Sequence, residues 1–585
     1  MKAVHDIKST ELARVIQFGD LFPEQTQNAP EVATLLQGLD RKSLCVLTGN
    51  MMSRLSGMPF FDNQLSFRDE KRDFITFFLS RNSPDFAADI LKRYKQFVDS
   101  DQFTGIEYVA TSKPAIMAFQ REFFALEPER FHFDPKIEHN FFKALLLINE
   151  RIYDAYCDED KYKEEPFPIN LAYIYLAYNY SNEDIEAHDI NSILNSQLTK
   201  CVTFFTFLFK SKDRRLKLMR RRFMEHYGIR KWAEYVLPHV TTLYRLRGDG
   251  RVLEFKGGGK KSIKSAKRVV AASCIDKDDI IPVSCNDDFK VFRSKPFIRL
   301  KKNSYVVTSL SFLIEHMYNS LYFELKQYCN EAGFKSEKAF RQFYTTEFSH
   351  KYMFEGYVSL CAPYNSELLI AGSQADQLIT AARHKGEGVV PPDYYMRLPE
   401  GCVLFEFKDA LSMAKIKELR NPEEFLKLLR NRFFNMESHK GVPQIIDNVE
   451  CIQNGTFFYD NPSNSSLIYP VLVIDNPSFS IRGVRVMLEK MMREECAKRA
   501  IDSNKLRPLI LMDVATLKIY ADYISTNGLV KTFEEYYEYV DESGYIVQKD
   551  PFEALVSFSE YLKCIDAKPN INSTIKRMMR EVESL

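Results

Sequence analysis

The chain has 585 residues, of which 45% are hydrophobic, 13% aromatic and 27% charged. This composition excludes a disordered or low-complexity protein, and the length predicts two to four domains instead of a single core. Because 80 Lys and Arg residues stand against 79 Asp and Glu residues, the chain as a whole is not a polybasic nucleic-acid binder. Any nucleic-acid surface must therefore be local.

Eleven cysteines are scattered between Cys45 and Cys564 without a CxxC pair. An odd number without metal-ligand spacing favours reduced thiols over a disulfide framework or a zinc site. The N-terminal residues lack the apolar stretch of a signal peptide, and the longest apolar runs fall far short of the roughly 20 residues of a membrane helix. We therefore expect a soluble, cytoplasmic protein without membrane contact.

Residues 1–205 are expected to form a helical N-terminal domain. Apolar residues recur there at spacings of three and four, as in 74–97 and 141–156, while strand-like alternation is scarce. Because no catalytic combination of side chains stands out, a scaffold or a region that binds a protein partner is the simplest interpretation.

Residues 206–340 are predicted to form a basic, mainly helical middle region. Between Lys210 and Arg268, nineteen Lys and Arg residues accompany only five Asp and Glu residues. Such a stretch either neutralises nucleic-acid phosphates or forms a solvated helix face, and the sequence leaves both interpretations open. The glycines at 257–259 do not complete a phosphate-binding P-loop, because Glu254 stands where that motif requires glycine.

Beyond residue 340 the pattern becomes mixed. Apolar segments at 402–407, 469–474 and 509–512 are expected to be strands, with helix-like segments between them. Strands that alternate with helices predict a sheet covered by helices. We place a catalytic domain at 341–525 and C-terminal helices at 526–585. The expected fold class is α+β and multidomain, with a large helical region followed by an α/β/α domain around a mixed sheet.

The segment 391–410, PPDYYMRLPEGCVLFEFKDA, carries the main chemical signal. Because side chains alternate along a strand, Glu406 and Lys408 are expected on one face and the phenylalanines around them on the other. A hairpin through the turn at 399–401 would bring Asp393 to the same place. Hydrolysis of a phosphodiester needs carboxylates that bind a hard divalent cation and a cationic group that orients the attacking water, which is the set present here.

The acid-x-Lys pattern alone is weak, because it recurs elsewhere in the chain, for example at Asp6, Glu254, Asp288 and Glu324. In the nearest rival, the upstream acid lies only five residues before Glu254, which leaves little room for a strand and a turn. The remaining copies lack an upstream acid on a strand. The context therefore singles out the copy at Glu406.

In this context the segment resembles the PD-(D/E)XK nuclease superfamily, which has a restriction-endonuclease-like fold. In that family a helix with a Glu precedes the PD strand, and a helix that often bears Gln follows the ExK strand. Four elements carry the resemblance, in the family's order: Phe354-Glu355, Pro392-Asp393, Glu406-Phe407-Lys408 and Gln444. They lie within 341–525, so the resemblance covers less than a third of the chain.

The resemblance implies an endonuclease that depends on Mg²⁺ or Mn²⁺ and cleaves nucleic acid, with DNA as the expected substrate. Asp393 and Glu406 would bind the metal, and Glu355 would complete or orient the ligand set. Lys408 would position the water, and Gln444 would help to hold the lysine or a phosphate. A large helical region beside such a domain fits a role in anti-phage defence or restriction, by analogy.

One segment departs from the family's pattern. Residues 366–390 are rich in small and polar residues. They form either a loop over the substrate groove or an insertion that displaces the strand of Asp393. Two nearby histidines, His350 and His384, are interpreted as ordinary surface or core residues.

Two alternatives remain. The chain could be a nucleic-acid-binding or assembly protein that retains a nuclease-like fold without cleavage, with the basic stretch as its main functional surface. It could also be a helical effector that acts on protein partners, in which the pattern at 393–408 is accidental. The sequence does not distinguish DNA from RNA or endonuclease from exonuclease, and it leaves the trigger and the oligomeric state open.

Overall fold

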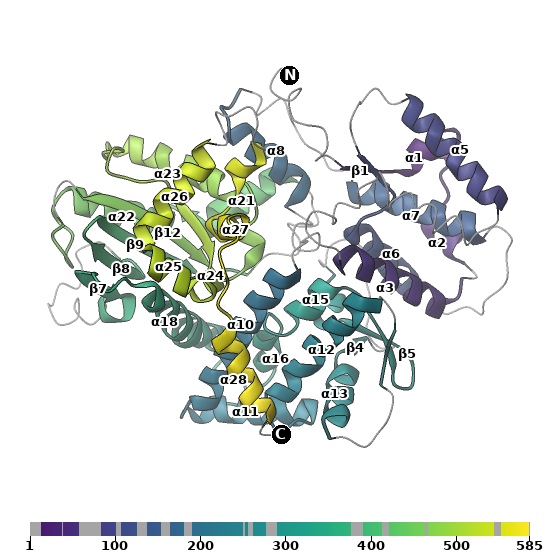
Figure 1. The fold of residues 1–585 in the computed structure, drawn as a ribbon, viewed down its shortest axis with the longest axis horizontal. Helices are drawn as coiled ribbons and strands as arrows, with labels where there is room; N and C mark the ends of the chain where they lie inside the picture. The colour runs from purple at the N-terminus through teal and green to yellow at the C-terminus, as the bar shows by residue number, and fades with distance from the viewer. Residues whose placement is uncertain are drawn as a thin grey trace.

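The protein is described by a computed structural model. The residues that it describes are 13–37, 39–57, 84–100, 107–125, 137–153, 164–180, 190–249, 252–255, 261–275, 289–375, 390–411, 421–462, 466–542 and 551–583. Helices dominate the N-terminal half, and two mixed sheets of four and five strands follow (Figure 1). An α+β protein with a mostly helical N-terminal half was predicted, and this part of the prediction is confirmed.

The first helices lie at the right of Figure 1 and pack around a core that also includes residues between 289 and 312 of the middle region. The short strands β1 and β2 pair in parallel and join the start of this region to residues 107–109. Residues 58–83, which include the start of the predicted helix at 74–97, lie outside the described residues. The elements are β1 (Ala13–Val15), α1 (Phe18–Leu21), η2 (Pro23–Asn28), α2 (Val32–Leu36), α3 (Arg41–Gly57), α5 (Pro84–Ser100), β2 (Glu107–Val109), α6 (Lys113–Ala125) and α7 (Ile137–Tyr153). Helix α8 (Ile169–Asn179) follows in the chain but belongs to a different core, which it shares with the five-stranded sheet.

The middle region is helical but also contains a four-stranded sheet with the order β3-β6-β5-β4, which the prediction lacked. Its strands are two to five residues long, too short to give a clear alternating pattern. The elements are α10 (Ile190–Lys210), α11 (Arg214–Tyr227), α12 (Ala233–Asp249), β3 (Leu253–Glu254), α13 (Lys261–Ala272), β4 (Cys274–Ile275), α14 (Lys290–Ser294), β5 (Phe297–Lys301), β6 (Ser304–Val307), α15 (Leu310–Glu315) and α16 (Leu321–Lys326).

The five-stranded sheet has the order β13-β12-β9-β8-β7. Strand β12 runs parallel to both β9 and β13, whereas β8 is antiparallel to β9 and to β7. The three strands predicted at 402–407, 469–474 and 509–512 are confirmed as β9, β12 and β13. The strands are β7 (Leu368–Ala371), β8 (Tyr394–Leu398), β9 (Gly401–Lys408), β12 (Leu467–Ile474) and β13 (Ile510–Asp513).

Helices cover both faces of this sheet (Figure 1). Alternate residues of its strands belong to two different cores, so that Phe405 packs with α10 and the C-terminal helices while Leu404 packs with α8, α22 and α23. The remaining elements are α17 (Glu337–Phe343), η4 (Tyr344–Phe354), α18 (Glu355–Val358), η5 (Ser359–Cys361), α21 (Pro422–Phe433), β10 (Phe434–Asn435), β11 (Lys440–Gly441), α22 (Val442–Gln453), η6 (Pro477–Phe479), α23 (Val484–Lys498), α24 (Val514–Ile519), α25 (Ala521–Asn527), α26 (Leu529–Glu542), η7 (Pro551–Leu555), α27 (Phe558–Cys564) and α28 (Asn572–Glu583).

Within the described part of the chain, no helix is both long enough and apolar enough to span a bilayer. The described cysteines are free thiols, and most of them are buried.

Candidate active site

The hairpin β8–β9 places Asp393 beside the acid-x-Lys strand. Its pairing runs from Leu398 opposite Gly401 to Tyr394 opposite Phe405, so Asp393 comes next to Glu406. The Asp393 Oδ2 atom accepts a hydrogen bond of 2.7 Å from the backbone N–H of Phe407. This bond ties the carboxylate to the neighbouring strand.

Glu406 and Lys408 lie on the same face of β9, and the Lys408 ammonium group contacts Glu406 Oε1 directly. Glu406 is only 1% exposed, and its Oε2 atom has no hydrogen-bond partner among the described residues. Burial and the charge of Asp393 raise the pKa of Glu406 to about 8, although Lys408 and the backbone N–H of Gly441 act in the opposite direction. Burial opposes the charge on Lys408, but the two carboxylates nevertheless raise the pKa of its ammonium group.

A third part of the site comes from the helix that precedes the sheet. Elements α17, η4 and α18 follow one another without a break, and η4 is a π-helix of 11 residues. Such π-helical segments often occur at functional sites. His350, on η4, places its Nε2 atom 3.0 Å from Asp393 Oδ1 and its Nδ1 atom 3.4 Å from Glu355 Oε1.

His350 is a cation in this arrangement. Burial disfavours the charge, but the contacts with Asp393 and Glu355 outweigh burial and raise the pKa of the imidazole to about 10. Burial would raise the pKa of the Asp393 and Glu355 carboxyl groups, but the contacts with His350 lower both pKa values. Lys408 also lowers the pKa of Asp393, and Ser373 also lowers that of Glu355. The sequence interpretation had left His350 out, and its only signal was a position five residues before Glu355.

The end of β7 supports the same carboxylates. The backbone N–H and the hydroxyl of Ser373 donate to the two oxygens of Glu355, at 3.0 and 2.8 Å. The N–H of Gly372 donates to the carbonyl of Asp393 at 2.8 Å, and a Cβ on Gly372 would lie 2.9 Å from that oxygen. The start of the predicted insertion at 366–390 thus holds the site together, whereas residues 376–389 lie outside the described residues.

Gln444, which the resemblance gives the role of holding Lys408 or a phosphate, contacts the backbone just before Asp393. Its Nε2 donates to the carbonyl of Pro391 at 2.8 Å, and Asn448, one turn further along α22, donates to the carbonyl of Val390 at 3.0 Å. Among the described residues, no hydrogen bond joins Gln444 to Lys408. Gln444 therefore holds the chain that leads into Asp393.

The donor set fits a hard divalent cation in part. Asp393 and Glu406 supply two neighbouring carboxylates, and Glu406 Oε2 is a buried acceptor that finds no donor among the described residues. Among the residues that the structure describes, however, no three His, Cys, Asp or Glu side chains already surround one cation position. Mg²⁺ is commonly held by one or two carboxylates together with water and substrate phosphates, so two protein ligands are sufficient.

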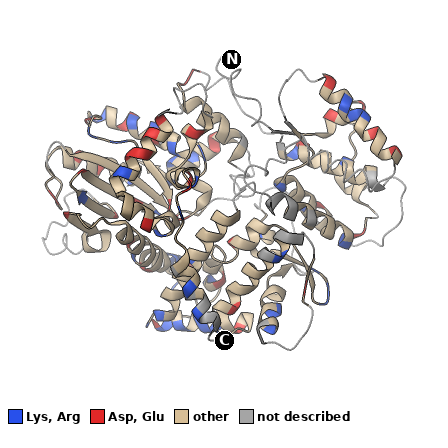
Figure 2. Ribbon diagram, viewed as in Figure 1, with Lys and Arg blue, Asp and Glu red and all other residues tan. Residues whose placement is uncertain are grey.

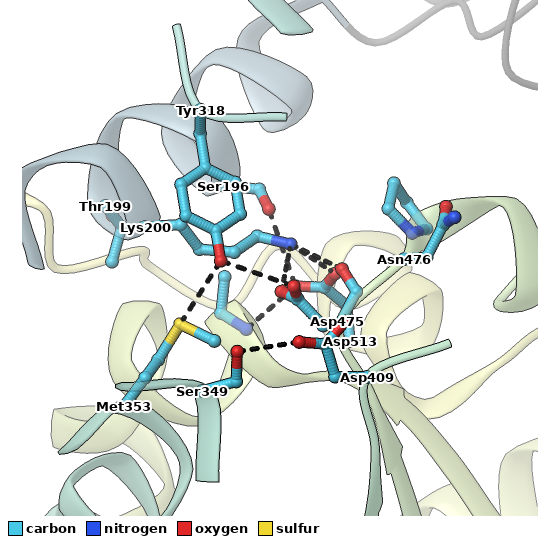
Figure 3. Close-up of polar contacts among 12 residues, drawn as sticks. Ser196, Thr199, Lys200, Tyr318, Ser349, Met353, Asp409, Asp475, Asn476 and Asp513 are labelled. Atoms are coloured by element: carbon cyan, nitrogen blue, oxygen red, sulfur yellow. Dashed lines mark hydrogen bonds and ion pairs between the residues drawn. The ribbon is translucent and has the colours of Figure 1, made fainter. Parts of the chain in front are cut away.

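A second group of side chains, which we call the polar cluster, lies where β9, β12 and β13 end (Figure 3). The fully buried Lys200 of α10 donates to Asp475 Oδ1 at 3.2 Å and to Asp513 Oδ2 at 3.1 Å. Tyr318 donates to Asp475 Oδ2 at 3.3 Å. Asp409, which directly follows Lys408, is the third aspartate of the polar cluster. Lys200, Tyr318 and these three aspartates are its members.

The polar cluster connects the active-site strand with the helices. Asp409 accepts a hydrogen bond of 2.7 Å from Ser349, the neighbour of His350, and an ion pair of 2.6 Å joins it to Arg341 on α17. The sequence interpretation missed this cluster. Its signal is an aspartate at the carboxyl end of each of three parallel strands, an edge at which polar sites commonly form in α/β sheets.

Comparisons of the chain with protein-family models, curated proteins and solved structures find no match.

Proposed function

We propose that this chain is a metal-dependent nuclease that hydrolyses phosphodiester bonds, with DNA as the preferred substrate class. The observation that carries the proposal is the convergence of Asp393, Glu406 and Lys408 at one end of the β8–β9 hairpin. Helix α18 precedes three antiparallel strands, β7, β8 and β9; helix α21, the small β10–β11 pair and helix α22 then lead to β12, which is parallel to β9. This order is compatible with the restriction-endonuclease-like fold that the sequence resemblance implies.

The residues divide into a metal-binding pair and groups that orient it. Asp393 and Glu406 would hold Mg²⁺ or Mn²⁺, which would neutralise charge on the phosphate and lower the pKa of a water. Lys408 is placed to hold the attacking water by a hydrogen bond, because its ammonium group already lies against Glu406. His350 orients Asp393 and Glu355, and Gln444 fixes the backbone before Asp393.

A non-catalytic nucleic-acid-binding protein is the second candidate. It is favoured by the direct contact of Lys408 with Glu406 and by the incomplete cation site among the described residues. In that case Lys408 would be the permanent counterion of a buried carboxylate. The two candidates differ in whether metal-dependent cleavage occurs.

Cleavage of supercoiled plasmid and of single-stranded RNA tests the proposal. The full chain is assayed with Mg²⁺, with Mn²⁺ and with EDTA, next to Lys408→Ala and Glu406→Gln. The matched control is Lys326→Ala, which removes the lysine of the acid-x-Lys copy at Glu324, on helix α16 and outside the site.

We expect metal-dependent cutting of DNA by the wild-type protein and by the control. The two site variants should cut at least about a hundredfold more slowly, a usual loss for groups that orient or activate the nucleophile. Circular dichroism verifies that they remain folded. A wild-type protein that never cuts in the presence of metal would remove the basis of the proposal. Wild-type rates in the Lys408 variant would show that the site is wrongly assigned.

A further inference from the structure

Helix α11 carries an unusually cationic outer face. It has six Lys and Arg residues and a single acid, Glu225. Leu216, Met219, Phe223 and Tyr227 form its buried side. Its exposed residues are all polar or charged, and the basic ones among them are Arg214, Lys217 and Arg221. Their spacing of three and four residues places these three on one stripe of the helix.

Three other arginines of α11 are used to attach the helix. Arg215 lies over the rings of Phe334 and Phe343, 4.3 and 4.8 Å from their centres. Arg222 pairs with Glu331 and with Glu225, and Arg220 donates to the carbonyl of Phe209. These contacts explain part of the basic composition as ordinary packing.

The outward stripe has no such role. In the described part of the chain, no ion pair or hydrogen bond involves the side chains of Arg214 and Lys217. Arg221, which is 63% exposed, has only a 3.8 Å contact with Glu225. Exposed pairs of this kind contribute little, so the positive charge of the stripe is not compensated.

Helix α13 extends this charge. It contains no Asp or Glu, and its Lys264 and Arg268 are exposed. Arg268 donates to the carbonyl of Gly228 at the end of α11, at 2.9 Å, and joins the two helices. Figure 2 shows Lys and Arg gathered on α11 and α13 at the lower end of the view. Outside residues 210–268 the chain has 61 basic and 74 acidic residues, so this concentration is local.

We propose that α11 and α13 form a basic surface that binds the phosphate backbone of a nucleic acid. The basic surface consists of Arg214, Lys217, Arg221, Lys264 and Arg268. An uncompensated row of cations on a rigid helix suits a polyanion with regularly spaced charges. A membrane is a poorer partner, because α11 exposes no apolar side chain that could insert into lipid. The choice of a nucleic acid over an acidic protein rests on the proposed function.

The inner side of α11, opposite the basic surface, contacts the helix that leads to the active site. Arg215 packs on Phe343, the last residue of α17, and the helix continues as η4 to His350. Phe343 and His350 are seven residues apart in the chain, which is on the order of 10 Å along a helix axis. Helix α11, which carries most of the basic surface, therefore packs on the same run of helix that carries His350.

The test measures binding without cleavage. The full chain in EDTA is titrated against a short labelled DNA duplex at several salt concentrations. The variant is Arg214→Glu with Lys217→Glu, two exposed positions in the first turn of α11, where acidic residues favour a helix. The matched control is Lys92→Glu with Lys95→Glu, two exposed lysines at the same spacing on α5.

We expect the wild type and the control to bind equally. The α11 variant should bind at least about tenfold more weakly, and the slope of log affinity against log salt should fall by about 2, one unit for each lost phosphate contact. A neutral variant with Gln at positions 214 and 217 should have an affinity for the duplex between those of the wild type and the α11 variant. Unchanged binding by the α11 variant, an equal loss in the control or no binding by the wild type would overturn the inference.

A competing polyanion separates the partner classes. Poly-glutamate that binds as tightly as DNA and depends on the same two residues would overturn the choice of a nucleic acid. The outcome is independent of the cleavage assay, because the duplex is bound without metal. A protein that binds DNA through α11 but never cuts it would refute the proposed nuclease and retain the basic surface.

Discussion

His350 links two carboxylates of the site, and the sequence did not predict it as functional. Its two ring nitrogens contact carboxylates that come from different elements, Asp393 before β8 and Glu355 at the start of α18. Without a cation between them these carboxylates would repel each other. The imidazole therefore determines how Asp393 is presented.

We predict that His350→Ala lowers the cleavage rate roughly ten- to hundredfold, the usual effect of removing a group that orients a metal ligand. The metal concentration that gives half of the maximal rate should rise as well, because Asp393 is no longer held. The control is His439→Ala, since His439 also contacts an aspartate, Asp447 at 2.8 Å, but outside the site. Equal rates for the wild type and His350→Ala would contradict the positioning role.

At the scale of elements, the active site depends on how closely α22 approaches β9. Gly441 begins this helix with a φ of +80°, and a Cβ there would lie 2.3 Å from the carbonyl oxygen of Phe433. Its backbone N–H also acts on the Glu406 carboxylate, where it works to lower the pKa against the effect of burial. One residue without a side chain thus allows the turn and also contacts the site.

Gly441→Ala should destabilise the protein by at least about 2 kcal/mol, because a left-handed conformation and a backbone clash are combined. It should also slow cleavage, since α22 carries Gln444 and must shift. Gly455 at the other end of α22 is the matched control: its φ is +67°, but nothing lies within 4 Å of a Cβ there. Gly455→Ala should cost only about 1 kcal/mol. If Gly441→Ala and Gly455→Ala unfold at the same urea concentration, the predicted extra cost of the clash at Gly441 is wrong.

The elements that the sequence predicted are those with local patterns. Strand β9 and its hairpin follow from a nearly continuous apolar run and a turn, so the proximity of Asp393 and Glu406 could be anticipated. The contacts of His350 depend on a π-helical segment, for which no local pattern exists. The role of Ser373 depends on the end of β7 meeting α18. Such contacts arise only from tertiary packing, and the spacing of apolar residues along the sequence does not predict them.

At the scale of the whole molecule, α10 joins the helical region to the sheet. A single apolar core contains residues of α10, of the middle helices and of one face of the sheet. The only tryptophan, Trp232, is buried in this core and stacks on Phe205 of α10 with 5.4 Å between ring centres. Its fluorescence therefore reports on the integrity of the layer that contains α10.

Lys200 of α10 adds a buried ionic contact between this helix and the sheet. It is 0% exposed and lies between Asp475 and Asp513, which end strands β12 and β13. Lys200→Met keeps the volume but leaves two largely buried carboxylates without their cation. We predict a loss of roughly 3–5 kcal/mol, the cost of breaking a buried ion pair from one side. Urea unfolding followed by Trp232 fluorescence measures it.

A triple variant determines whether the stability lost in Lys200→Met comes from unpaired charge or from altered packing. Combining Lys200→Met with Asp475→Asn and Asp513→Asn removes the unpaired charges, and replacing a whole buried ion pair is often close to neutral. The triple variant should therefore recover most of the stability that Lys200→Met loses, a coupling that independent sites would not show. If the triple variant is no more stable than Lys200→Met, then the lysine acts through packing, and the polar cluster does not hold α10 to the sheet by charge.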